Sequence, residues 1–438
     1  MSHAAYGRKI LAAAVIAVVT TQGPAAWAEN CSGERCDAVA RGLIDFVDRR
    51  LHGLGTNGRS CADCHMPLDS LQLSPADAEA RFQLLQNRRR YFPNADDPLF
   101  RPLDADDFRV NGDAASDFSN LRQNGLIRVT LPLAATIRLI DPVTNAPSAD
   151  TTVDVWRSVP SVLNVRLTGS DNLNPWPRGP NATGGFQLDA RVATLEEQAH
   201  GAIMNHAEAL HEPTAGLLAD IAALQNVLFS SPRVRQLSDA VRSGASSLPD
   251  IDPPLDTLQT QGKAIFIRAC AQCHGGPGMS TTQAPVVRFH DIFTQCPRPV
   301  DTVSPPRFLF TPCPARLARN ARTYEIKLID GTVARRTSSD PGRALLSGFV
   351  GGIAGKDDWN KLDVPGLRGI ARTAPYFHNN SAATLEEVAD HYVQFYKRVQ
   401  VNAPPGTVPP VASTDGVHFD RALQPEERDA LVAYLRAL

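Results

Sequence analysis

The chain has 438 residues, with 44 lysines and arginines against 46 aspartates and glutamates, so its formal net charge is −2. This balance and the absence of a basic patch argue against a nucleic-acid-binding protein. With 34 prolines, 30 glycines and 6% aromatic residues, the composition predicts many loops, and the length is sufficient for two or three domains with cores of their own.

The N-terminus has the features of a secretory signal peptide. Two basic residues, Arg8 and Lys9, precede an apolar run over 10–19, and the sequence Ala-Trp-Ala at 26–28 provides the small residues of a cleavage site. The run is too short to span a bilayer comfortably, and no later segment is long and apolar enough to do so. We therefore predict a signal peptide over 1–28 and an exported protein, which in a bacterium places it in the periplasm.

Two helices and a pair of strands are predicted in the first third of the chain. Apolar residues recur at helical spacing through 37–52, and the stretch 74–90 is a second helix candidate with Pro75 in its first turn. Farther on, 126–133 and 136–140 are apolar, β-branched runs joined by a short connection. They predict a β-hairpin inserted between helical parts.

A Cys-x-x-Cys-His motif occurs twice, at 61–65 and at 270–274. In c-type haem attachment the two thiols bind the haem vinyl groups, and the histidine is the proximal ligand of iron. A thioredoxin-like redox pair or half of a zinc site is the alternative, but the first needs no histidine and the second needs two more ligands. We predict two covalently bound c-type haems, the first held by Cys61, Cys64 and His65 and the second by Cys270, Cys273 and His274.

Four further cysteines lie outside these motifs, at positions 31, 36, 296 and 313. In an oxidising compartment an even remainder predicts disulfides, most simply Cys31 with Cys36 and Cys296 with Cys313. Buried free thiols are the alternative.

Two landmarks follow each haem motif in the same order. A Val-Pro pair occurs at 159–160 and 364–365, and the sequence Ala-Thr-Leu-Glu-Glu occurs at 193–197 and 383–387. This internal repeat predicts one haem domain over 29–250 and a second over 251–438. Each Thr-Leu-Glu-Glu is also a capping box that begins a helix, which explains the second glutamate of each pair but not Glu196.

Several segments of the second half resemble the bacterial dihaem cytochrome c peroxidase and MauG superfamily. The segments are 288–290, 340–343, 362–368, 373–380 and the helix that begins at Thr384. The resemblance is stronger over 256–438 than over 37–210. It implies a mainly α fold of two cytochrome c-type domains, here with the hairpin inserted in the first. It also implies an interdomain calcium ion, an N-terminal haem that reacts with peroxide and a C-terminal haem that relays electrons.

The resemblance also implies roles for individual residues. Glu196 aligns with the catalytic glutamate of the family. Tyr392 aligns with the axial ligand of the second haem, where the peroxidases carry methionine and MauG-type proteins carry tyrosine. His391 is the alternative ligand, but it points about 100° away around the same helix. Family peroxidases that need reductive activation carry a histidine after the first motif, and none occurs between His65 and His200, so we expect an open, five-coordinate first haem.

Other polar and aromatic residues receive supporting roles. His200 and His206 are interpreted as surface histidines, or as residues that support the site, rather than as distal groups. By resemblance, His290 and His378 support haem packing or the propionates. Trp176 is either an electron relay between haems or a loop anchor. For calcium the family uses backbone carbonyls near Thr373 and Pro375, and its asparagine ligand aligns with Ser158.

Together these features favour an exported dihaem c-type oxidoreductase. The expected reaction is reduction of hydrogen peroxide at the N-terminal haem, with electrons from a small cytochrome or copper protein passing through the C-terminal haem. A MauG-like or rubber-oxygenase-like enzyme that oxidises a protein or an organic polymer is the first alternative. A non-enzymatic dihaem electron-transfer cytochrome is the second.

Overall fold

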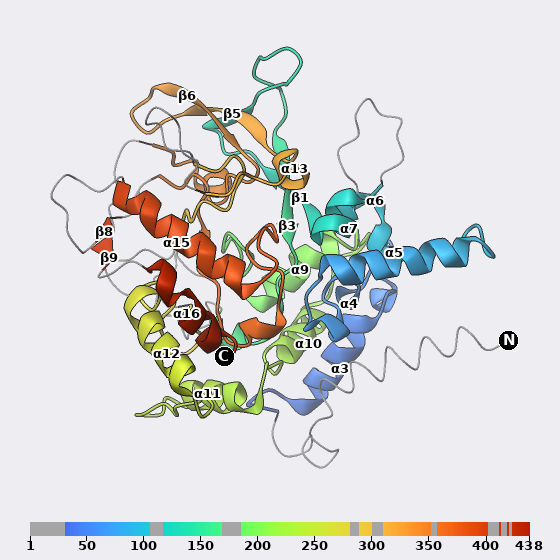
Figure 1. The fold of residues 1–438 in the computed structure, drawn as a ribbon. Helices are drawn as coiled ribbons and strands as arrows, with labels where there is room; N and C mark the ends of the chain where they lie inside the picture. The colour runs from blue at the N-terminus through green and yellow to red at the C-terminus, as the bar shows by residue number, and fades with distance from the viewer. Residues whose placement is uncertain are drawn as a thin grey trace.

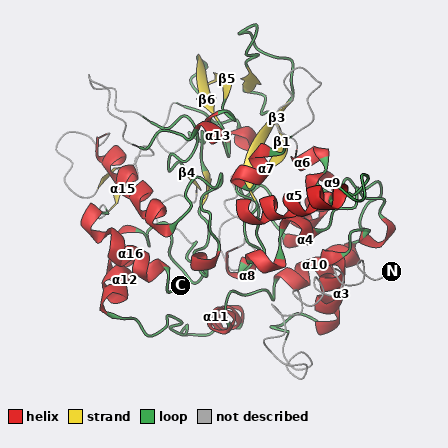
Figure 2. Ribbon diagram, turned by 45° about the vertical axis from the view of Figure 1, so that its right-hand side comes forward, coloured by secondary structure: helices red, strands yellow, loops and turns green. Residues whose placement is uncertain are grey.

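The computed structural model describes residues 31–105, 117–168, 185–280, 289–299, 310–351, 357–401, 411–412, 418–419 and 423–438. The signal peptide expected over 1–28 and Trp176 lie outside these ranges. The fold is mainly helical, and the longer strands lie at the top of the view in Figure 2. Within the described ranges, no helix combines the length and the apolar character that crossing a membrane requires.

The first half of the chain is built on helices that surround the first motif. They are α3 (Cys36–Val47), α4 (Cys61–Cys64), α5 (Pro75–Arg89), α6 (Pro102–Ala105), α7 (Ser119–Asn124), α8 (Val165–Thr168), α9 (Leu195–Asn205) and α10 (Ala215–Gln225). Both helices predicted in this region are confirmed, as α3 and α5. The first is shorter than expected, since it ends at Val47 and a separate 3-10 turn covers Leu51–Gly53.

The helix α11 (Pro232–Arg242) ends shortly before residue 250, where the second half is expected to begin. The described helices of the second half are α12 (Thr257–Ala269), α13 (Ala315–Ala318), α14 (Ala344–Ser347), α15 (Leu385–Val401) and α16 (Arg428–Leu435). Short 3-10 turns cover Pro67–Asp69, Pro98–Phe100, Ile370–Arg372 and Pro425–Glu427.

Each half contains a pair of helices whose backbones pack in close approach. In the first half α3 packs on α10, and in the second α12 packs on α16 (Figure 1). A Cβ added to Gly42 would lie 1.9 Å from the Asp220 carbonyl oxygen, and one added to Gly262 would lie 1.9 Å from that of Ala430. Glycine is therefore required at both crossings. The internal repeat seen in the sequence is thus a repeat of helix packing.

The predicted hairpin forms two strands, but they do not pair with each other. The runs become β1 (Leu126–Pro132) and β2 (Ile137–Leu139). β1 pairs antiparallel with β3 (Thr152–Ser158), and β2 pairs antiparallel with β5 (Arg322–Lys327) of the second half, which also pairs with β6 (Val333–Ser338). The prediction of a hairpin was therefore wrong in its pairing. Local sequence indicates which residues are extended, whereas the partner is chosen by burial against the other half.

The strands enclose one apolar cluster that both halves provide. Val155 of β3, Tyr324 and Ile326 of β5, and Trp359 are buried together in it. Two further two-residue pairings occur in the described ranges, β4 (Phe289–His290) with β7 (Leu362–Asp363) and β8 (Val411–Ala412) with β9 (His418–Phe419). The insertion therefore joins the two halves rather than extending the first alone.

A buried ion-pair network also crosses between the halves. Arg157 of β3 donates to Asp340 at 2.7 Å and to Asp189 at 2.5 Å, and the three side chains are 4%, 1% and 0% exposed. Burial alone would raise the pKa of Asp340, but the Arg157 guanidinium beside it holds that pKa below its ordinary value. Because removing one partner would leave a buried charge unpaired, the network favours one arrangement of the halves.

Candidate haem sites and their surroundings

The first haem motif is held rigidly by the residues before and inside it. In α4, the backbone N–H of Ser60 donates to the Asp63 carboxylate at 2.9 Å, and this carboxylate also pairs with Arg49 at 2.6 Å and Arg81 at 3.0 Å. These contacts fix the turn between Cys61 and Cys64, so the two thiols keep the one-turn spacing that attachment to two vinyl groups requires.

The cysteines divide as the sequence predicts. Disulfides join Cys31 to Cys36 and Cys296 to Cys313, with Cα atoms 5.4 and 5.8 Å apart. The four motif cysteines are not disulfide-bonded. Burial raises the pKa of the Cys61, Cys64 and Cys270 thiols to about 12. These thiols are therefore protonated and apolar in character, in surroundings suited to an apolar group such as the haem edge.

Each motif histidine is neutral and presents one ring nitrogen. Burial lowers the pKa of His65 to about 4, against opposing hydrogen bonds to the backbone of Leu71 and Pro160. Its Nδ1 lies 3.1 Å from the Leu71 carbonyl oxygen. A carbonyl can only accept, so we assign the proton of the neutral ring to Nδ1, which leaves the Nε2 lone pair available to a metal.

The second motif repeats this geometry. Nδ1 of His274 lies 3.1 Å from the carbonyl oxygens of both Met279 and Pro365, and burial lowers the pKa of His274 to about 4. Pro160 and Pro365 are the prolines of the two Val-Pro landmarks, so this landmark places a carbonyl against the proximal histidine in both halves. Met279 contributes only its backbone carbonyl to this contact.

A cavity of about 400 Å³ lies beside the second motif. Cys270, Cys273 and His274 line it on one side, and it continues to Ser158 and Gln187 of the first half. Its apolar lining includes Phe266, Leu367, Val388, Phe395 and Leu431. An apolar cavity with two thiols and one presented imidazole nitrogen is what a covalently attached haem requires, so these residues fit that group.

Tyr392 lines this cavity and His391 does not. Nε2 of His391 lies 2.6 Å from the Ile292 carbonyl oxygen, and the His391 ring packs 4.8 Å from the ring of Phe377. Tyr392 faces the side of α15 that carries the cavity lining, and burial raises the pKa of its phenol. The geometry therefore favours Tyr392 as the residue opposite His274, while an axial bond to iron stays a prediction.

Both predicted capping boxes form, and neither uses the Glu196 side chain. Thr194 Oγ1 accepts from the backbone N–H of Glu197 at 3.1 Å, and the Glu197 carboxylate accepts from that of Ala193 at 3.1 Å. The same two bonds form at 383–387 in the second half. Glu196 is exposed and has no hydrogen bond or ion pair with another described residue, whereas its counterpart Glu386 pairs with Arg436. Glu196 is thus a carboxylate that the fold does not use.

Ala202 was not singled out from the sequence, although the repeat contains the signal. Tyr392 is eight residues after Thr384, and the residue eight after Thr194 is Ala202. An alanine methyl group cannot bind iron. The first half therefore has no side-chain ligand at the position that Tyr392 occupies in the second, which supports an open first haem independently of the missing loop histidine.

The two histidines of the α9 region have partners away from the thiols. Nε2 of His200 lies 2.8 Å from the Glu212 carboxylate at the surface. Nδ1 of His206 lies 3.0 Å from the buried Asp104 carboxylate, which also pairs with Arg59, two residues before the first motif. These contacts agree with surface and supporting roles, and His206 helps to position the segment that enters α4.

His290 and His378 both line the second cavity. Nδ1 of His378 lies 3.1 Å from the Thr294 hydroxyl, and burial lowers the pKa of His378 to about 4. Their placement is compatible with packing against a haem in the cavity, as the resemblance implies.

Residues of the first half donate hydrogen bonds to backbone carbonyls near the place expected for calcium. The Ser158 hydroxyl donates to the Phe377 carbonyl at 3.2 Å, and the Gln72 amide donates to that of Ala374 at 2.7 Å. Among the described residues, no group of three or more acidic, histidine or cysteine side chains could hold a metal ion. The calcium ligands that the resemblance implies are mainly backbone carbonyls, so calcium binding at this place stays a prediction.

Comparison with known proteins gives structural matches only. No protein-family model matches the chain, and no curated protein does. A MauG-like protein associated with microbial copper homeostasis matches with 18% identity over 93% of this chain and 90% of that chain, at a TM-score of 0.43. The dihaem peroxidase BthA of Burkholderia thailandensis matches with 18% identity over 92% and 86%, at 0.39.

A hydrazine synthase of Kuenenia stuttgartiensis also matches, with 17% identity over 78% of this chain and 86% of that chain, at a TM-score of 0.31. The first two matches extend over more than nine-tenths of this chain.

Proposed function

We propose that this protein is a dihaem c-type oxidoreductase that reduces hydrogen peroxide at the haem held by Cys61, Cys64 and His65. Electrons would arrive through the second haem, on His274, from a small cytochrome or copper protein. The observation that carries the proposal is the asymmetry of the two otherwise matching halves. Both halves hold the motif histidine through Nδ1, but Tyr392 of the second half lines the cavity beside His274, whereas the equivalent residue of the first half is Ala202.

The bound haem would supply an iron that transfers electrons to peroxide. The chain holds His65 for this purpose, because the hydrogen bond from Nδ1 to the Leu71 carbonyl orients the ring and increases electron donation by Nε2. At the position where the second half has Tyr392, the first half has Ala202, whose methyl group cannot bind iron. A haem held by His65 would therefore meet no competing ligand from this position when peroxide binds.

Glu196 is the proposed acid/base. Reduction of H₂O₂ to two waters consumes two electrons and two protons, and cleavage of the O–O bond requires a proton on the departing oxygen. A carboxylate beside the peroxide can take the proton from the near oxygen and deliver it to the far one. Glu196 is free of the hydrogen bonds that occupy Glu197, so its carboxylate is available for this transfer.

Tyr392 supports a second candidate function. A phenolate ligand favours more oxidised iron than a thioether does, so a tyrosine opposite His274 would make the second haem a poor entry point for low-energy electrons. It would instead suit a haem that stores oxidising equivalents. The MauG-like alternative, oxidation of a protein or organic substrate, follows from this one residue.

Steady-state assays of the holoprotein separate the candidates. Rapid peroxide consumption with a reduced small cytochrome or copper protein is expected from the proposed function. Oxidation of a protein or organic substrate at the expense of peroxide, without such a donor, would favour the alternative. A protein that exchanges electrons but does neither would be a dihaem electron-transfer cytochrome. Export to the periplasm, proposed from the sequence of residues 1–28, is tested by N-terminal sequencing of the mature protein.

A further inference from the structure

The C-terminal end of helix α5 projects from the first half of the molecule. Leu85, which is 1% exposed, is the last buried residue before the chain returns to the interior at Pro98. In Figure 1 this end of α5 extends beyond the neighbouring helices. We call the segment 87–94 the α5 tip, and every residue in it is exposed. The helix therefore holds these side chains away from the body of the protein.

The α5 tip is strongly basic. Its sequence is Asn-Arg-Arg-Arg-Tyr-Phe-Pro-Asn, with three arginines and no acidic residue, in a chain whose net charge is −2. Arg88 and Arg90 have no side-chain hydrogen bond or ion pair with another residue in the described ranges, and Arg89 donates to the Ala95 carbonyl at 3.0 Å. Successive residues of a helix are about 100° apart around its axis, so the three guanidinium groups surround the helix end.

The two carboxylates that follow the α5 tip in the chain do not neutralise it. Asp96 pairs with Arg101, and Asp97 pairs with Arg81. Both acidic side chains are thus engaged by arginines outside the tip. The positive charge of the tip is therefore available to an anionic partner.

Two aromatic rings lie at the same helix end, directly after the arginines. Tyr91 is 80% exposed and Phe92 is 69% exposed, and Phe349, at 50%, is the only other exposed aromatic residue in the described part of the chain. The backbone N–H groups of Tyr91 and Phe92 donate to the Arg88 carbonyl at 3.2 and 2.9 Å, so a hydrogen-bonded turn holds both residues at the helix end. Because such rings gain free energy when they leave water, a second surface would stabilise them.

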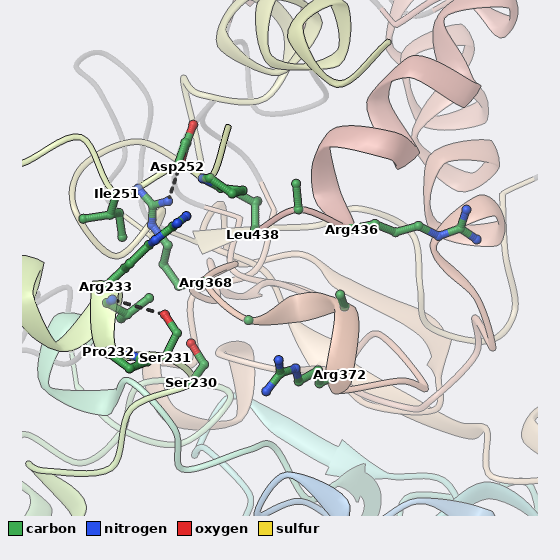
Figure 3. A pocket seen from close by; sticks show the side chains of 15 residues that line it. Ser230, Ser231, Pro232, Arg233, Ile251, Asp252, Arg368, Arg372, Arg436 and Leu438 are labelled. Atoms are coloured by element: carbon green, nitrogen blue, oxygen red, sulfur yellow. Dashed lines mark hydrogen bonds and ion pairs between the residues drawn. The ribbon is translucent and has the colours of Figure 1, made fainter. Parts of the chain in front are cut away.

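A second group of arginines lacks this combination of features. A cavity of about 390 Å³ is lined by Arg233, Arg368, Arg372 and Arg436 (Figure 3). Figure 3 shows Arg368 paired with Asp252, while Arg436 pairs with Glu386. The Leu438 carboxylate lines the same cavity, and no aromatic residue does. Positive and negative groups alternate there, whereas the α5 tip carries positive charge alone beside two exposed rings.

Two simpler explanations account for part of these features. Arginines in the last turn of a helix stabilise the negative end of the helix dipole, but this effect does not require exposed aromatic rings. A protein-binding surface is the second explanation. Stable protein interfaces involve about 20 to 30 residues on each side, which exceeds what the end of one helix provides. A lipid bilayer needs only a few side chains, because arginines bind lipid phosphates while aromatic rings enter the headgroup region.

We propose that the α5 tip docks on an anionic phospholipid bilayer, with the arginines of 88–90 at the lipid phosphates and Tyr91 and Phe92 among the headgroups. Charge complementarity and the two rings at a projecting end carry this proposal. Arg81 of the same helix pairs with Asp63 of the first motif at 3.0 Å, so docking would turn the first half toward the bilayer. The association is peripheral and depends neither on haem chemistry nor on peroxide.

Co-sedimentation of the mature holoprotein with lipid vesicles tests the docking. Binding is expected to vesicles of equal parts phosphatidylglycerol and phosphatidylcholine and not to phosphatidylcholine alone, and added salt should weaken it. The combined variant Arg88→Gln, Arg89→Gln and Arg90→Gln should weaken binding about a hundredfold, since each basic residue near an anionic surface contributes about fivefold. Phe92→Ser should weaken it about tenfold, because the ring no longer leaves water.

A matched control removes the same charge from other elements. The combined variant Arg233→Gln, Arg335→Gln and Arg372→Gln changes three exposed arginines outside α5 and should bind the vesicles as the wild type does. Haem absorbance and thermal unfolding confirm that each variant is folded. Hydrogen exchange with and without the phosphatidylglycerol vesicles locates the contact, and protection is expected over 87–94.

Several results would overturn the proposal. They are no binding to either kind of vesicle, equal binding to both kinds, equal loss of binding in the control and the α5 variant, and protection confined to another part of the chain. If vesicles give no protection of the α5 tip but a soluble acidic cytochrome does, the tip docks a protein and the lipid assignment is wrong. None of these readouts depends on peroxide turnover, so failure of the docking and failure of the proposed function are distinguishable.

Discussion

The two halves of this protein differ at the positions where chemistry is expected and agree where a haem must be held. Both pack a helix pair across a glycine, both anchor the motif histidine through Nδ1, and both begin the following helix with the same capping box. They diverge eight residues into that helix, where the first half has Ala202 and the second has Tyr392. They also diverge in its first turn, where Glu196 is free and Glu386 is paired with Arg436. A repeated scaffold thus carries different side chains at equivalent positions of its two halves.

The largest effect that should separate the halves comes from their equivalent glutamates. Glu196→Gln is expected to reduce peroxide turnover on the order of a hundredfold or more with unchanged haem content, because an amide cannot transfer the proton. The control is Glu386→Gln, which removes an exposed ion pair worth no more than about 1 kcal/mol and leaves turnover unchanged. If Glu196→Gln leaves peroxide turnover unchanged, Glu196 is not the acid/base and is only a residue of the first helical turn.

A second difference is the buried histidine of the second half. His378 has Leu188 as its counterpart, six residues before each capping threonine. Burial lowers the pKa of His378 from 6.5 to about 4, so below pH 6.5 the unfolded chain binds a proton that the folded chain does not. The contribution of His378 to the free energy of unfolding is therefore complete above pH 6.5 and decreases as the pH falls toward 4. At pH 5 the decrease is roughly 2 kcal/mol.

Urea unfolding of the wild type and of His378→Leu at pH 7 and pH 5 measures this effect. The variant adopts the residue of the first half and should lose less stability between the two pH values than the wild type. An identical loss in both proteins would show that His378 does not titrate on unfolding.

The third comparison concerns Ala202. The resting ferric wild type should contain one high-spin, five-coordinate haem without prior reduction, seen by absorption and EPR spectroscopy. Ala202→Tyr copies the second half into the first, and it should convert that haem to low spin and reduce turnover about tenfold by occupying the peroxide position. A wild-type spectrum with only low-spin haem would contradict the open first site.

The smallest expected effect comes from changing Tyr392, the equivalent residue of the second half. This change should alter the haem spectrum more than the rate of peroxide turnover. Tyr392→Phe should turn a low-spin ferric second haem into a high-spin one, because the phenol oxygen is lost. His391→Ala should leave that spectrum unchanged, since the His391 ring is bonded to the Ile292 carbonyl. If His391→Ala changes the spectrum and Tyr392→Phe does not, the axial ligand is His391.

Several features followed from the sequence because they depend on short spacings along the chain. The Cys-x-x-Cys-His motifs, the capping boxes at Thr194 and Thr384, and the helices α3 and α5 each involve residues within a few turns of one another. The disulfide between Cys31 and Cys36 is equally local. Such patterns follow from backbone geometry and covalent reach, which operate before the chain has folded.

The tertiary structure decided everything that depends on distant partners. β2 pairs with β5 rather than with β1, although the runs at 126–133 and 136–140 are neighbours in the chain. The Arg157 network spans 183 residues to Asp340. Contacts between residues so far apart in the chain depend on the apolar surface and the charges that the whole chain buries. Short stretches of sequence do not contain that information.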